Sequence, residues 1–289
     1  MKLVRYGEPG RERPGVWLDD TPVTGRSSLL DVRSMAYDIA DFDGPFFARW
    51  GLDRLRALLG EGGRKLVPAE GVRLGPPVAR PAKILCLGRN FLDHALEFGG
   101  DGLPERPVVF SKAVTALAGP NDPLVLPDDA EVVDGEVELA LVVGRRLRKA
   151  AATEAMGAVA GYCVLNDITD RVAQRAGKQW FCGKGRDGFC PLGPYLVTAD
   201  EVPDPYMLTL KGGVNGRVLQ EAPAGDMHFR IGPTLAYLSR HMTLEPGDVV
   251  SMGTPGGIGS ARDPRILLQV GDTVEAEIDG LGRQACKVV

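Results

Sequence analysis

The sequence has little cysteine, little histidine and no long apolar stretch. No run of apolar residues reaches the roughly 18 that a membrane helix needs, so we expect no membrane span. The five cysteines form no C-x-x-C pair, which favours reduced thiols in a cytoplasmic protein. Met1–Gly7 contains no apolar core followed by small residues, so we expect no signal peptide.

The chain also lacks an excess of positive charge. It carries 34 Lys and Arg against 38 Asp and Glu, for a formal net charge of −4 over 289 residues. Such a chain has no bulk attraction to nucleic acid or to anionic lipid, so neither is an expected partner. With 44% hydrophobic and 25% charged residues, the composition is that of a globular protein.

Turn-forming residues, in contrast, are abundant. The 38 glycines and 22 prolines indicate many short strands and few helices, and therefore a mainly β protein with mixed pairing. A proline-dense stretch from Pro68 to Pro81 is typical of a domain linker. We expect a small N-terminal domain over residues 1–78 and a larger domain over residues 79–289.

The apolar spacing predicts individual elements. Predicted helices cover Asp53–Gly60, Asp93–Phe98 and Pro233–Met242, with a helical turn at Thr153–Gly157. Predicted strands cover Gly15–Leu18, Ile84–Leu87, Val108–Lys112, Glu136–Val143, Val159–Leu165, Val249–Met252, and a hairpin of Thr273–Ile278 and Gln284–Val288.

Two glutamates in the clearest predicted strand suggest a metal site. Glu136 and Glu138 are two residues apart, so they share one face of a strand that is otherwise apolar. Burial and like-charge repulsion oppose two ionised carboxylates there, and a bound cation such as Mg²⁺, Mn²⁺ or Ca²⁺ removes both penalties. The alternative, stronger for an isolated E-x-E motif, is a solvated strand end with both glutamates paired to arginines.

A third carboxylate follows the next predicted strand. Asp167 comes directly after Val159–Leu165 and Asn166, where it could complete a three-carboxylate site. The alternative is that Asp167 caps the N-terminus of a helical segment that runs through Gln174.

His94 and Glu97 form a candidate acid–base pair. They are three residues apart on a predicted helix, so the carboxylate can orient the imidazole, which could then deprotonate water. The chain has only three histidines, and this one lies next to Gly88–Asn90. On spacing alone, an incidental pair on a surface helix is at least as good an interpretation.

Two glycine-rich segments could approach a ligand. Lys184 lies between two glycines and could reach an anionic group, although a solvated loop charge is the favoured alternative on spacing alone. Gly253–Gly259 follows a predicted strand and matches neither a Walker loop nor a dinucleotide fingerprint. It is either a backbone loop close to a ligand or a tight turn.

Taken together, these segments resemble the fumarylacetoacetate hydrolase family in their order and approximate spacing. The likeness covers about residues 80–260 and reverses the alternatives for the E-x-E pair and for Asp167. The matching stretches are Ile84–His94, Phe110–Ala116, Asp134–Ala140, Ala160–Asp167, Phe189–Gly193 and Met242–Pro255.

The resemblance implies three groups of site residues and a Mg²⁺ cofactor, with Mn²⁺ or Ca²⁺ as alternatives. The metal ligands are Glu136, Glu138 and Asp167. The catalytic residues are His94 and Glu97, on a lid helix, and Lys184. The substrate-binding residues are Arg89, Asn90, Lys112, Gln174 and Thr254.

The resemblance also implies fold and activity. The expected fold is α+β and mainly β: a mixed β-sandwich roll of the fumarylacetoacetate hydrolase C-terminal type, with a small N-terminal α+β domain, assembled as a homodimer. The expected reaction is metal-dependent hydrolysis of a C–C bond in a 2,4-diketo acid, an acylpyruvate or a diketo-deoxy-sugar acid, through a metal-bound pyruvate enolate. The opening Met1–Gly7 most resembles the diketo-deoxy-sugar-acid hydrolase subgroup.

Two alternatives remain open at this stage. One is an oxaloacetate decarboxylase or muconate-type isomerase that uses the same site, and the other is a catalytically silent protein that binds metal and an oxo acid. The second is suggested by loops that depart from the family pattern at Gly185–Gly188 and Ala222–Asp226, while Phe91 and Gly135 are further departures. Within them, Arg186 is either a contact for a second substrate carboxylate or a solvated arginine.

Overall fold

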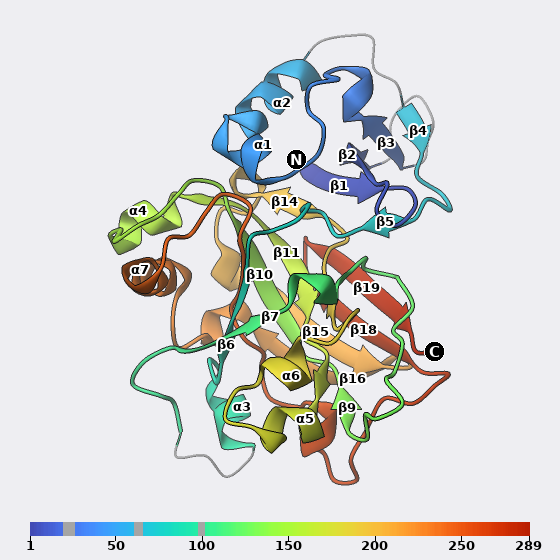
Figure 1. The fold of residues 1–289 in the computed structure, drawn as a ribbon, viewed down its shortest axis with the longest axis vertical. Helices are drawn as coiled ribbons and strands as arrows, with labels where there is room; N and C mark the ends of the chain where they lie inside the picture. Colours follow the sequence, from blue (N-terminus) through green and yellow to red (C-terminus); the bar gives the residue numbers. More distant parts are fainter. Residues whose placement is uncertain (20–26, 61–65, 98–101) are drawn as a thin grey trace.

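The computed structural model describes residues 1–19, 27–60, 66–97 and 102–289, and strands dominate it (Figure 1). The largest sheet has eleven strands, with mostly antiparallel pairing and a parallel contact between β17 and β6. The predicted α+β, mainly β fold with mixed pairing is therefore confirmed. From edge to edge, the strands are β4 (Leu66–Pro68), β3 (Ser28–Asp31), β2 (Arg13–Leu18), β1 (Lys2–Tyr6), β14 (Leu196–Thr198), β11 (Val159–Asn166), β10 (Val137–Val143), β17 (Val249–Ser251), β6 (Ile84–Gly88) and β7 (Val108–Lys112), while β5 (Leu74–Gly75) pairs with β1.

The central strands β10 and β11 determine where the candidate site forms. Every residue of both strands is buried, as expected for strands that are apolar on both faces. They pair antiparallel with Val137 opposite Asn166, so the start of β10 meets the end of β11. The contact continues one residue further, where the backbone N–H of Asp167 donates to the carbonyl of Glu136 at 2.9 Å. This register brings the two predicted acidic segments together.

A second, antiparallel sheet packs against one face of the first. Its β18 and β19 form the hairpin that was predicted around Asp279–Gly280. Leu139 of β10 shares a hydrophobic core with Leu210 and Ile278 from this second sheet. The strands, in order, are β16 (Arg217–Pro223), β15 (Thr209–Val214), β18 (Thr273–Ile278) and β19 (Gly282–Lys287). Two short pairs join β12 (Thr169–Asp170) to β9 (Val133–Asp134) and β13 (Cys190–Pro191) to β8 (Leu117–Ala118).

The N-terminal strands extend the large sheet. β1 pairs antiparallel with β14, so that Leu3 lies opposite Leu196. Leu3 and Val16 belong to the same hydrophobic core as Ala140 and Cys163 of the central strands. The division of the chain at residues 78 and 79 stays a proposal.

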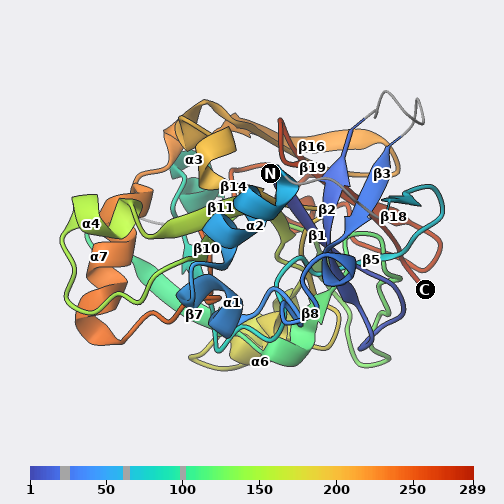
Figure 2. The same cartoon turned by 90° about the horizontal axis from the view of Figure 1, so that it is seen from above.

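The helices gather at two places. In Figure 1, α3, α5 and α6 lie at the end of the molecule away from the N-terminal strands, while α4 and α7 lie side by side on one flank, as Figure 2 also shows. Among the residues that the structure describes, no helix is long and apolar enough to cross a membrane. The helices are α1 (Gly44–Ala48), α2 (Gly51–Leu59), α3 (Leu92–Leu96), α4 (Ala152–Met156), α5 (Arg171–Ala176), α6 (Phe181–Lys184) and α7 (Ile231–His241). The predicted end of α3 at Phe98 lies outside the described residues.

Candidate active site and metal centre

Three buried carboxylates meet where β10 begins and β11 ends. Glu136 precedes β10, Glu138 lies within it and Asp167 follows β11, and their exposed fractions are 3%, 1% and 0%. One oxygen from each carboxylate lies within 4.8 Å of the others. Their burial excludes a solvated strand end, and three hard oxygen donors at this spacing fit a divalent cation such as Mg²⁺ or Mn²⁺.

A different aspartate caps the following helix. The side chain of Asp170 accepts hydrogen bonds from the backbone N–H groups of Val172 and Ala173, at 3.0 and 3.1 Å. Asp170 is therefore the N-cap of α5. The carboxylate of Asp167 instead lies with those of Glu136 and Glu138, and we call these three residues the acidic cluster. The alternative that Asp167 caps the helix is therefore excluded.

Buried basic side chains surround two of the three carboxylates. Lys184 Nζ lies 2.5 Å from Glu136 Oε2 and 2.6 Å from Asp167 Oδ2. Lys112 Nζ lies 2.5 Å from Asp167 Oδ1, and Arg171 Nη2 lies 2.6 Å from Glu136 Oε1. Lys184 is 2% exposed, so it is not the solvated loop charge that spacing alone favoured.

Glu138 has a different environment. It makes no ion pair with any described residue, and its Oε2 accepts a hydrogen bond from the Ser251 hydroxyl. Burial raises the pKa of Glu138 well above its ordinary value, and the charges of Asp167 and Glu136 raise it further. Burial also opposes ionisation of Glu136, but Arg171 and Lys184 hold the pKa of that carboxyl below its ordinary value. An added cation would favour the ionised form of Glu138, which fits a metal ligand.

Helix α3 brings His94 and Glu97 close to the acidic cluster. His94 Nδ1 lies 2.7 Å from Glu97 Oε2, and Glu97 Oε1 accepts a hydrogen bond from the backbone N–H of Gly257. The other ring nitrogen, Nε2, lies 3.9 Å from Glu136 Oε1. Since both side chains are largely buried, with exposed fractions of 12% and 15%, they are not an incidental surface pair.

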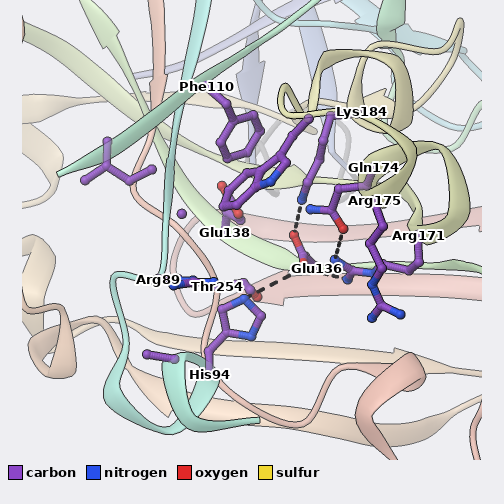
Figure 3. A pocket seen from close by; sticks show the side chains of 15 residues that line it. Arg89, His94, Phe110, Glu136, Glu138, Arg171, Gln174, Arg175, Lys184 and Thr254 are labelled. Carbon is purple, nitrogen blue, oxygen red and sulfur yellow. Dashed lines mark hydrogen bonds and ion pairs between the residues drawn. The ribbon is translucent and has the colours of Figure 1, made fainter. Parts of the chain in front are cut away.

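His94, Glu136, Glu138, Arg171 and Lys184 line one cavity of about 500 Å³. Asp167 and Glu97 contact these side chains but do not belong to the lining. Figure 3 shows Glu136 between Lys184 and Arg171, with His94 on the opposite side. The lining residues with functional side chains or aromatic rings are Arg89, His94, Phe110, Glu136, Glu138, Arg171, Gln174, Arg175, Trp180, Lys184 and Thr254.

Two predicted substrate contacts do not line this cavity. Asn90 is fully buried, and its side-chain amide donates to the carbonyl oxygens of Met252 and Phe229, at 2.7 and 3.2 Å. The Lys112 ammonium is also inaccessible and is bonded to Asp167. Both side chains are bonded within the protein, and their assignment as substrate contacts stays a prediction.

The structure also adds residues that the sequence analysis missed. Arg171 comes four residues after Asp167 and three before Gln174, a helical spacing that could have flagged it. Arg171 Nη1 lies 3.3 Å from Gln174 Oε1, which orients that amide in the cavity. Phe110 and Trp180 form an aromatic wall with ring centroids 5.3 Å apart, and no local sequence pattern indicated that contact.

Comparison with known protein families identifies the family to which the chain belongs. The family model described as fumarylacetoacetate (FAA) hydrolase C-terminal matches residues 83–289. The chain belongs to the fumarylacetoacetate hydrolase family. Members of this family are enzymes, hydrolases or isomerases, that act on small molecules, and they generally bind a divalent metal. The acidic cluster of this member fits such a metal.

Relatives of this family member include both kinds of enzyme. A relative from Burkholderia cenocepacia, provisionally named a hydrolase, is 42% identical and covers 98% of this chain and 97% of its own. Maleylpyruvate hydrolase from Sphingobium sp. SYK-6 is 30% identical, with a TM-score of 0.80 over 100% of this chain and 99% of that one. A 2-hydroxyhepta-2,4-diene-1,7-dioate isomerase from Mycobacterium marinum is 32% identical, with a TM-score of 0.77 over 100% of this chain and 98% of that one.

Proposed function

We propose that this fumarylacetoacetate hydrolase family member is a divalent-metal-dependent hydrolase that cleaves a C–C bond in a 2,4-diketo acid. The observation that carries the proposal is the position of His94 beside the acidic cluster: its Nε2 lies 3.9 Å from Glu136 Oε1. An oriented histidine next to a carboxylate cluster supports activation of water.

The acidic cluster would hold the cofactor through Glu136, Glu138 and Asp167. When bound, a Mg²⁺ or Mn²⁺ ion supplies Lewis-acid polarisation of the oxo-acid end of the substrate. Lys112 donates to Oδ1 of Asp167, while Oδ2 accepts from Lys184, which also donates to Glu136. Lys112 is therefore proposed as a positioning residue for a metal ligand.

His94 is proposed as the general base and acid. Glu97 holds Nδ1, so Nε2 removes a proton from water, and the water oxygen forms a bond to the C4 carbonyl carbon. The C3–C4 bond then breaks, and its electron pair remains on C3 of a pyruvate enolate. Nε2 returns the proton to C3, which yields pyruvate and a carboxylic acid with no net change in the enzyme.

Other residues of the cavity orient and stabilise the substrate. Burial alone would lower the pKa of Lys184, but Asp167 and Glu136 raise it, so the ammonium stays charged and can stabilise developing oxyanion charge. The Gln174 carbonyl accepts from Arg171, which leaves its N–H₂ group free to donate to a substrate oxygen. Thr254 Oγ1 already donates to the carbonyl of Val137 and accepts from Gln220, so it offers one remaining acceptor site.

A product assay in ¹⁸O water tests this proposal. We expect Mg²⁺-dependent release of pyruvate from acetylpyruvate or maleylpyruvate, with ¹⁸O in the carboxylic acid fragment. Release of CO₂ from oxaloacetate without cleavage of a diketo acid would replace hydrolysis with decarboxylation. Isomerisation of a dienedioate without cleavage would replace it with the isomerase alternative, which the M. marinum relative supports. The proposed homodimer is tested separately, by light scattering.

A further inference from the structure

Arg89 has an unusual backbone conformation at the cavity wall. Its φ of 55° lies in the left-handed region, which non-glycine residues rarely adopt. The next residue, Asn90, fixes the chain there through side-chain bonds to Met252 and to both backbone groups of Phe229. Such strain persists where the surroundings impose it, and it clusters at binding sites.

The guanidinium of Arg89 has no charged partner among the residues that the structure describes. Its side chain lines the cavity and is exposed, and it makes no hydrogen bond or ion pair with any residue in the described part of the chain. Arg171, in the same lining, is engaged by Asp134 and Glu136. Arg186, which the sequence offered as a contact for a second carboxylate, is paired with Asp129 and Asp170 and does not line the cavity.

Two aromatic rings lie next to the residue that precedes Arg89. The preceding residue, Gly88, is so close to the Trp180 ring that a Cβ there would lie 2.5 Å from Cζ3. The absence of a side chain at this position lets the indole pack against β6, and Phe110 extends the aromatic surface. Since the two rings are tilted by 60° to each other, an acyl chain could stack on one ring and meet the edge of the other, with its end toward the guanidinium.

We infer that Arg89 is a specificity-determining residue that selects diketo acids whose acyl tail ends in a second carboxylate. The inference rests on the proposed hydrolase function and narrows its substrate class. An arginine fork binds a carboxylate through charge-assisted hydrogen bonds, whereas a neutral tail gains nothing from it. Loss of the guanidinium should therefore affect dicarboxylic substrates alone.

Steady-state kinetics of R89M with two substrates test the inference. We expect kcat/KM for maleylpyruvate, which ends in a carboxylate, to fall about 10- to 100-fold, mainly through KM. The value for acetylpyruvate, which ends in a methyl group, should change by less than about 2-fold, and R89K should be intermediate for the diacid. Equal losses for both substrates, or no loss for the diacid, would overturn the inference.

Two matched variants control for general charge effects. R175M removes the other exposed arginine of the lining, on α5, and R217M removes an exposed arginine from β16. If R175M rather than R89M causes the selective loss, the assignment to Arg89 is wrong. A wild-type enzyme that cleaves neither diketo acid would instead refute the proposed hydrolase function, and one that cleaves only acetylpyruvate would refute the inference and leave that function intact.

Discussion

Glu97 holds His94 by one carboxylate oxygen and the Gly253–Gly259 loop by the other. Its Oε2 lies 2.7 Å from His94 Nδ1, while its Oε1 accepts a hydrogen bond from the backbone N–H of Gly257. The short helix α3 is thereby tied to the loop that follows β17. The bond sets the imidazole orientation that the proposed chemistry needs, with Nε2 toward Glu136.

This relationship predicts different effects of two substitutions on hydrolysis. H94A removes the base and should lower kcat by about 10²- to 10⁴-fold. E97Q keeps the length of the side chain but replaces the carboxylate by a neutral amide, which holds the imidazole less firmly. We therefore expect kcat to fall by a smaller factor of about 10 to 100. Calorimetric titration should show little change in Mg²⁺ affinity for either variant. Unchanged hydrolysis by H94A would remove the dyad from the mechanism.

Lys184 should stabilise the metal-free protein more than the metal-bound one. Its ammonium pairs with Glu136 and Asp167 in the buried cluster. K184M leaves both carboxylates short of positive charge, so the free energy of unfolding in EDTA should fall by about 3–5 kcal/mol. Mg²⁺ should then raise the melting temperature of K184M more than that of the wild type. Equal shifts would show that the lysine and the ion do not act on the same carboxylates.

Gly183 should be intolerant of any side chain. A Cβ at this position would lie 2.5 Å from the carbonyl oxygen of Asp170 and from the backbone nitrogen of Gln174. G183A must therefore separate α5 from α6, and we expect at least about 1–3 kcal/mol of destabilisation by chemical denaturation. G177A is the matched control, because its Cβ would meet only ordinary contacts at 3.8 Å and beyond. Similar losses in both variants would contradict the packing.

Thiol labelling should distinguish Cys182 from the other cysteines. Cys182 is exposed on α6, whereas Cys86, Cys163, Cys190 and Cys286 are buried. Burial raises the pKa of Cys190 and of Cys286 to about 12, which keeps both thiols protonated and unreactive at pH 8. Mass spectrometry after brief alkylation of the native protein should find only Cys182 modified. Labelling of Cys190 at a comparable rate would show that its surroundings open to solvent.

Much of the fold could be predicted because its determinants are local. The apolar runs that became β10 and β11, and the hairpin of β18 and β19, are recognisable from spacing alone. The pairing of β1 with β14 was not predictable in this way, because it joins Leu3 to Leu196 across nearly two hundred residues. Non-local pairing depends on the shape of the whole core and leaves no local pattern.

The acidic cluster was predictable mainly from the family resemblance, because the E-x-E spacing alone favoured a solvated strand end. The structure brings Glu136, Glu138 and Asp167 together through the register of β10 and β11. Asn90 and Lys112 lie outside the cavity lining, which a motif match could not show because it does not give the direction of a side chain. The sequence did not indicate that Trp180 lies close to Arg89. This proximity follows from the contact between Gly88 and the indole ring, which is a tertiary feature.

The most direct test of the account is calorimetric titration of Mg²⁺ into chelator-treated wild-type protein and E138Q. Glu138 is buried and has no ion pair among the described residues, so its amide counterpart should fold normally and keep its melting temperature in EDTA. E221Q, which alters an exposed glutamate on β16, is the matched control. The account predicts one Mg²⁺ site in wild type and E221Q, and an affinity at least about 100-fold weaker in E138Q. Undiminished binding by E138Q, or no binding by the wild type, would contradict it.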